Sequence, residues 1–208
     1  MSFSTYTELQ AAVLSFNWNR DTGSVADFIR LAHTRINLGL RTAFMQKTAD
    51  LTIDSYRIAA PSDMAAPVRL WLDDSYDTPL ARTSAERIAY LRATYSSGQR
   101  PQWYGIEGES DDLEYFVFAA DPGATTYTGK LLYIRRLAFF ASGSATNVVL
   151  DRFPNLYLYG ALDEAGAYSD DERTYGMRFE ALLAKINQQS LSDNYAGGPL
   201  TPTSAYAV

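Results

Sequence analysis

Residues 24–46, SVADFIRLAHTRINLGLRTAFMQ, set the helical part of the predicted fold. Apolar side chains recur there every three or four positions, the period that places them along one face of an α-helix. The spacing predicts one amphipathic helix from about Ser24 to about Gln46, roughly 30 Å long. Its single apolar stripe consists of Val25, Phe28, Ile29, Ala32, Ile36 and Leu40. A stripe of this kind faces a core, so we expect other helices to cover it.

A first helix is predicted before this segment. Thr5 and Glu8 have the spacing of a capping box, in which each side chain bonds the backbone N–H of the other residue. Apolar residues at helical spacing then continue to Phe16. The polar residues 17–23 that follow predict a loop between the two helices.

The last third of the chain returns to helical patterns. A short helical turn is predicted over 147–152, and a helix over 154–168 begins with a proline, which is well tolerated at the first helical position. Ser169 and Glu172 form another capping box, which opens a final helix that reaches about Leu191.

The middle of the chain has the alternating pattern of β-strands. A strand pair or a single bulged strand is predicted over 51–58. Further strands are predicted over 68–72, 102–107, 113–119 and 127–136, with turns at 61–63, 108–111 and 121–123. Thr83 and Glu86 form a capping box that predicts a short helix ending before Gly98. Close spacing and short turns favour an antiparallel meander over β–α–β units.

The predicted fold class is therefore α+β, with terminal helices forming a helical bundle and a central antiparallel β-rich subdomain. We assign the bundle to residues 1–48 and 145–192, and the β-rich insertion to residues 49–144. Residues 193–208 form the third segment, an extended tail, because two glycines and two prolines there prevent a continuing helix. Apolar residues in the tail, such as Tyr195, Leu200 and Tyr206, suit a segment that becomes ordered on a partner.

Composition excludes several classes of function. The 208 residues contain no cysteine, which rules out disulfides, thiolate zinc sites and iron–sulfur clusters. The formal net charge of −6 disfavours broad binding to phosphates, which depends on Lys and Arg. No apolar run approaches the roughly 20 residues of a membrane span, and the N-terminal residues do not resemble a signal peptide. We therefore expect synthesis in the cytoplasm and no membrane partner.

Candidate catalytic residues are few. His33 is the one histidine, so a histidine zinc site cannot be built. A serine–histidine triad would need a serine on a strained turn, and no G-x-S-x-G motif occurs, so His33 is predicted to be an ordinary helix residue. Acidic pairs occur at Asp73-Asp74, Asp111-Asp112, Asp163-Glu164 and Asp170-Asp171-Glu172. Turns and helix N-termini favour such acids for local reasons. The sequence predicts no catalytic residue, no cofactor and no metal site.

Several stretches together resemble the head-to-tail adaptor (connector) proteins of tailed bacteriophages. These are TYTELQAAV at 5–13, DFIRLA at 27–32 with RIN at 35–37 and LRT at 40–42, PSD at 61–63, RLWL at 69–72, FPNLYLYGAL at 153–162, DDER at 170–173 and YAGGPL at 195–200. Their order and spacing cover nearly the whole chain. The chain departs from the usual pattern at His33, where an acid is usual, and at Arg152-Phe153, where a basic residue and a histidine are usual.

The resemblance implies a structural virion protein without enzymatic activity. Its members form rings, here of twelve copies, that dock under the portal protein in the neck of the virion and extend the DNA channel towards tail or nozzle proteins. Genomic DNA would pass through such a ring without specific binding. The tail would bind the portal through Tyr195, Gly197, Gly198, Pro199, Leu200 and Tyr206.

Two other classes of function compete with this interpretation. One is a virion-associated cell-wall hydrolase, which needs two carboxylates about 5 to 9.5 Å apart in a cleft. The other is a nucleic-acid or ligand-binding module, which for DNA would show strongly salt-dependent binding.

Overall fold

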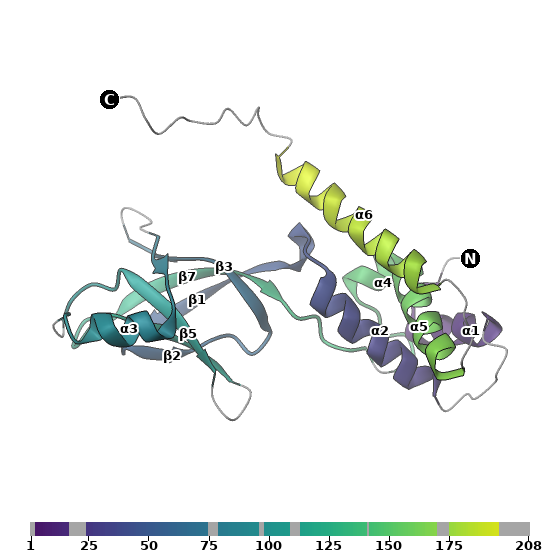
Figure 1. Ribbon diagram of the computed structural model, residues 1–208, viewed down its shortest axis with the longest axis horizontal. Coiled ribbons are helices and arrows are strands. Elements are labelled where there is room, and N and C mark those ends of the chain that lie inside the picture. Colours follow the sequence, from purple (N-terminus) through teal and green to yellow (C-terminus); the bar gives the residue numbers. More distant parts are fainter. Residues whose placement is uncertain are drawn as a thin grey trace. The chain divides into compact units, whose positions relative to one another are not determined.

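The computed structural model of the chain describes residues 3–16, 24–74, 79–95, 98–108, 113–140, 142–169 and 175–195. Contacts divide the chain into two compact units, residues 1–44 with 137–208, and residues 45–136. Helices make up the first unit, whereas two sheets and one helix make up the second (Figure 1). The α+β prediction is confirmed.

The helical unit is organised around one central helix. Its helices are α1 (Tyr6–Phe16), α2 (Val25–Gly39), α4 (Val148–Arg152), α5 (Pro154–Ser169) and α6 (Tyr175–Tyr195). Helix α5 contacts each of the other four, and Figure 1 shows α2, α5 and α6 along one another. The packing buries the predicted apolar stripe of α2 almost completely.

Side-chain caps define the starts of α1 and α4. The Glu8 N–H donates to Thr5 Oγ1 at 3.3 Å, and Glu8 Oε2 accepts from the Thr5 N–H at 3.2 Å, so the predicted capping box is confirmed. Asn147 Oδ1 accepts from the N–H groups of Val149 and Leu150 at 3.0 and 2.9 Å. Such caps satisfy N–H groups that have no partner within the helix.

The predicted end of the second helix is wrong. Helix α2 ends at Gly39 instead of near Gln46, and the chain continues through a short 3₁₀ turn, η1 (Ala43–Met45), into a strand. The backbone N–H of Arg41 donates to Asn187 Oδ1 on α6 at 2.8 Å. Tertiary hydrogen bonds thus replace the helical bonds that the apolar period predicted.

Helix α6 is longer than predicted. It continues to Tyr195, so residues 193–195 are helical and do not belong to an extended tail. The first glycine of the C-terminal segment stands at 197, and no residue over 191–195 is a glycine or proline that would end the helix earlier. Three predicted elements lie wholly or partly outside the described residues. They are the loop at 17–23, the turn at 108–111 and the capping box at 169–172.

The second unit contains two sheets that share one core. The first has the order β1-β7-β3 and is antiparallel, with strands at Gln46–Ile53, Tyr127–Arg135 and Met64–Leu72. The second has the order β2-β6-β5-β4, with strands at Arg57–Ala59, Glu114–Phe118, Trp103–Gly108 and Ala81–Arg82. Its β4–β5 pair is parallel.

The predicted meander is therefore wrong in its last step. Strand β7 does not pair with β6 but lies between β1 and β3 in the other sheet. Burial explains this arrangement, because Leu131 and Tyr133 of β7 and Phe116 and Phe118 of β6 are all buried in one cluster. Two facing sheets can enclose these side chains, and each large apolar side chain contributes roughly 1.5–3 kcal/mol when buried.

Helix α3 (Ala85–Arg92) covers the second sheet through Ile88, which packs against Val117 and Ala119. The residue that caps it is Ser84, whose Oγ accepts from the Arg87 N–H at 3.2 Å. The predicted cap at Thr83 is therefore wrong by one residue. Thr83 instead donates its backbone N–H to the Tyr104 carbonyl at 2.9 Å, which continues the pairing beside β5.

Candidate functional site

The residues predicted to bind a portal are not gathered into a described site. Tyr195 is the last residue of α6, and Gly197, Gly198, Pro199, Leu200 and Tyr206 lie outside the described residues. Their role stays a prediction. The polar clusters of the helical unit can be described in detail.

His33 is more than an ordinary helix residue. It is buried on α2, with Nδ1 2.7 Å from the Tyr157 hydroxyl of α5 and Nε2 2.9 Å from the Leu137 carbonyl oxygen. Its ring stacks on Tyr157 at a centroid distance of 6.1 Å and meets the edges of Phe139 and Phe140. His33 thus joins α2 to α5 and to the chain that returns from the second unit.

The hydrogen-bond network assigns the proton of the imidazole. The Leu137 carbonyl accepts both from Nε2 of His33 and from the amide of Asn37, while Asn37 Oδ1 accepts from the Leu137 N–H at 2.9 Å. We assign the proton to Nε2, because the Leu137 carbonyl can only accept. The amide nitrogen of Asn37 also lies 2.9 Å from Nε2, and in this assignment it directs its hydrogen to the Leu137 carbonyl instead. Nδ1 then accepts from Tyr157, whose oxygen accepts from the amide of Asn147 at 2.8 Å.

Burial lowers the pKa of His33, although the hydrogen bond to Leu137 opposes this effect. Burial also raises the pKa of Tyr157 far above its ordinary range, against the donation from Asn147. Both groups are therefore neutral near pH 7. A neutral, fully paired cluster is typical of a core that fixes helix positions rather than of a general base.

Arg35 joins three helices through carboxylates. Its Nη1 lies 2.6 Å from Asp163 and 3.0 Å from Glu164 on α5, and its Nη2 lies 2.9 Å from Glu180 on α6. The guanidinium carbon also lies 4.4 Å from the ring centre of Phe179. These hydrogen bonds outweigh the effect of burial and raise the pKa of Arg35. The pair Asp163-Glu164 is thus occupied by a structural cation.

The other acidic pairs are also explained locally where they are described. Asp73 lies 3.1 Å from Lys130 Nζ, and Asp74 forms an ion pair with Arg100. The clusters at 111–112 and 170–172 lie outside the described residues. Across the parts of the chain that the structure describes, no group of three or more histidine, aspartate or glutamate side chains could hold a metal ion. Within the same parts, no helix is long and apolar enough to cross a membrane.

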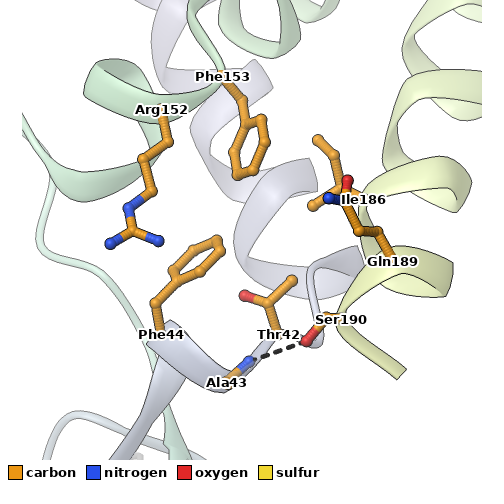
Figure 2. A pocket seen from close by; sticks show the side chains of 8 residues that line it. All are labelled: Thr42, Ala43, Phe44, Arg152, Phe153, Ile186, Gln189 and Ser190. Atoms are coloured by element: carbon orange, nitrogen blue, oxygen red, sulfur yellow. Dashed lines mark hydrogen bonds between the residues drawn. The ribbon is translucent and has the colours of Figure 1, made fainter. Parts of the chain in front are cut away.

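A pocket of about 470 Å³ opens beside the last turns of α6 (Figure 2). Its lining consists of residues 42–44, Arg152, Phe153 and three residues of α6, namely Ile186, Gln189 and Ser190. The rings of Phe44 and Phe153 are 5.9 Å apart at an angle of 33°, and both are half-buried. The pocket combines two aromatic walls with a buried aliphatic side chain, Ile186.

The polar groups of the pocket are one cation and several neutral groups. The Arg152 guanidinium lies 5.4 Å from the ring centre of Phe44, and no carboxylate lines the pocket. Ser190 Oγ accepts from the Ala43 N–H at 3.1 Å, which fixes residues 42–44 to α6. Thr42 Oγ1 is buried and has no hydrogen-bond partner among the described residues. Such a hydroxyl costs about 1–3 kcal/mol when it stays unpaired.

Sequence patterns alone predicted neither the His33 cluster nor this pocket. The His33–Tyr157 and Phe44–Phe153 contacts join residues more than 100 positions apart, which local patterns do not reveal. One signal in the sequence pointed to the pocket. Arg152-Phe153 departs from the usual family pattern, and both residues line the pocket.

The chain thus combines a helical unit with a two-sheet unit. Residues 4–203 match the SU10 adaptor protein family, so the chain belongs to this family of bacteriophage structural adaptor proteins. No curated protein matches the sequence.

Proposed function

We propose that the protein is a subunit of an adaptor ring, of twelve copies, that joins the portal of a phage capsid to its tail. The observation that carries this proposal is the family match over residues 4–203, which spans both units and most of the C-terminal segment. In this role the protein acts in the neck of the virion and has no enzymatic activity.

The outer face of α2 supports association with neighbouring copies. Leu31 and Leu38 stand seven positions apart on this face and are 49% and 71% exposed. A ring places copies side by side through two different surfaces, so each copy needs an apolar contact of this kind. Large exposed apolar side chains in one row are unusual on a helix that faces only water.

The use of the charged groups supports a structural role over a hydrolase. The carboxylates of Asp163 and Glu164 both bind Arg35, so both take part in an ion-pair network between α2 and α5. A hydrolase would need one carboxylic acid with a raised pKa beside a second carboxylate. The net charge of −6 fits a channel through which DNA passes without being held.

The tail is proposed to bind the portal through Tyr195, Gly197, Gly198, Pro199, Leu200 and Tyr206. The glycines and prolines over 197–202 disfavour a helix there, and the apolar residues supply contacts. Tail or nozzle proteins are proposed to dock on the other side of the ring.

Mass photometry of the purified protein, alone and mixed with its cognate portal ring, tests the proposal. We expect the portal peak to gain the mass of twelve copies of a 23.1 kDa chain, which is about 277 kDa. A folded protein that leaves the portal peak unchanged would contradict the adaptor role. Activity and DNA-binding assays would then separate the hydrolase from the binding module.

A further inference from the structure

We propose that the pocket lined by Phe44, Arg152, Phe153 and Ile186 is a second portal-binding site, which takes an apolar side chain next to a carboxylate of the portal protein. This inference rests on the proposed adaptor function and deepens it. It assigns a site in the described part of the chain, separate from the tail.

The walls of the pocket suit an apolar side chain. Phe44 and Phe153 are half-buried and converge on the same opening, and the buried Ile186 lies beside them (Figure 2). A volume of about 470 Å³ is within the range of sites that enclose a small molecule or a few side chains. Partly exposed aromatic rings around a hollow are typical anchors of protein interfaces.

The positive charge of Arg152 favours a partner with an acidic side chain beside the pocket. Arg152 is exposed at the rim and forms no ion pair with any carboxylate in the described residues, while no acidic residue lines the pocket. A guanidinium binds a carboxylate through two parallel hydrogen bonds. The hydroxyl of Thr42, which has no partner among the described residues, is a further polar group at the wall.

The position of the pocket favours the portal over other partners. Ser190 lines the pocket, and Tyr195, the first of the proposed portal-binding residues, stands five residues later on the same helix. A rise of 1.5 Å per residue places these positions about 7.5 Å apart along the helix axis. A partner that holds the chain from Tyr195 onwards is therefore close enough along α6 to reach the pocket as well.

The pocket is also held in shape before any partner binds. Asn187 accepts from the Arg41 N–H at 2.8 Å and donates to the Gly39 carbonyl at 2.9 Å. Together with the Ser190–Ala43 bond, these contacts fasten residues 39–43 to α6. A preformed site loses less conformational entropy on binding.

Photo-crosslinking identifies the occupant. The full chain carries p-benzoylphenylalanine in place of Phe44 and is irradiated in the presence of cognate portal rings. We expect a covalent adaptor–portal product. The matched control replaces Met177, which is 68% exposed at the opposite end of α6, and should give no such product. Crosslinks only between adaptor copies, or none in a sample that binds the portal, would overturn the inference.

Affinity for the portal provides the second test. Arg152→Glu should raise the Kd by about tenfold or more, and Arg152→Gln by a smaller factor, because each removes the cation that holds the carboxylate. Arg178→Glu is the matched control, since Arg178 is also an exposed arginine beside an aromatic ring, 5.9 Å from the centre of Tyr159. It should change the Kd less than about threefold. Circular dichroism checks that each variant is folded.

The outcomes separate this inference from the function on which it rests. If the unaltered protein does not bind the portal, the proposed function fails. If it binds and both Arg152 variants bind equally well, the pocket assignment fails and the adaptor role stands. If Arg152→Glu loses association between adaptor copies but keeps the affinity of a single copy for the portal, the pocket belongs to the ring contact and the inference is wrong.

Discussion

The hydroxyl of Tyr157 donates a hydrogen bond to Nδ1 of His33 over 2.7 Å and so joins the central helix α5 to α2 inside the core. The two residues are 124 positions apart, and the whole second unit lies between them in the sequence. The stability of the helical unit should therefore depend on this pair.

Tyr157→Phe removes the hydroxyl and leaves Nδ1 of His33 and the amide of Asn147 without their partner. We expect the free energy of unfolding to fall by about 1–3 kcal/mol. Tyr159→Phe is the matched control, because Tyr159 is half-exposed on the same helix, and it should change stability by less than about 0.5 kcal/mol. Urea denaturation measures both. Equal effects of the two variants would contradict the structural role of the pair.

Stability should also depend on the charge of His33. The pKa of His33 is lowered in the folded protein, whereas the unfolded chain titrates near 6.5. As the pH falls through 6.5, the unfolded state binds a proton before the folded state does, so the free energy of unfolding decreases. The decrease is at most about 1.4 kcal/mol per pH unit. Urea denaturation between pH 7.5 and 5.5 should show this slope, and His33→Gln should remove it. An unchanged slope in that variant would assign the effect to other groups.

Substitutions at two helical glycines, Gly160 of α5 and Gly39 of α2, test how tightly the helices pack. A Cβ at Gly160 would lie 2.9 Å from the Ala32 Cβ and 3.1 Å from the Phe179 ring, and both neighbours are buried. We expect Gly160→Ala to destabilise the protein by about 1–3 kcal/mol. A Cβ at Gly39 would approach only the end of the Leu183 side chain, which can rotate away. Gly39→Ala should therefore be the milder change in thermal denaturation. The reverse order would show that α5 can shift.

The Arg35 network should show energetic coupling between α2 and α5. In a double-mutant cycle of Arg35→Met and Asp163→Asn, we expect a coupling energy of about 1 kcal/mol, because the pair is only partly shielded from water. The coupling should decrease in high salt. A coupling energy near zero at low salt would mean that Glu164 and Glu180 replace Asp163 fully.

A stop codon after Tyr195 removes residues 196–208 and leaves α6 complete. The truncated protein should unfold like the full chain and bind the portal ring more weakly, by about tenfold or more. Mass photometry at several concentrations gives the occupancy of the ring. Unchanged occupancy would remove the tail from the portal-binding site while leaving the pocket to be tested separately.

Local signals in the sequence predicted the local structure well. The capping box of Thr5 and Glu8, the helix opening at Pro154 and the strand at 127–136 all depend on residues that are neighbours in the chain. The end of α2 could not be predicted in this way, because Asn187 and Ser190 decide it from about 145 positions away. The same reason explains the meander error, since β7 pairs with strands that precede β6 by more than 40 residues.

The same difference between local and long-range contacts applies to the candidate sites. The sequence showed that one histidine is too few for a zinc site and that no G-x-S-x-G motif supplies the serine of a triad. It did not show the partners that surround His33, or that Arg35 would bind Asp163 and Glu164. These contacts arise only once α2, α5 and α6 pack together.

The discontinuous helical unit has a consequence for synthesis on the ribosome. The apolar face of α2 is complete at Leu40, but α5, which covers it, begins only at Pro154, 114 residues later. At a translation rate of 5–20 residues per second, that apolar face remains uncovered by α5 for roughly 6 to 23 seconds. The two-sheet unit, residues 45–136, is continuous and can fold within this interval. We therefore expect nascent chains stalled before α5 to recruit chaperones through α2, and a chaperone pull-down of such chains would check it.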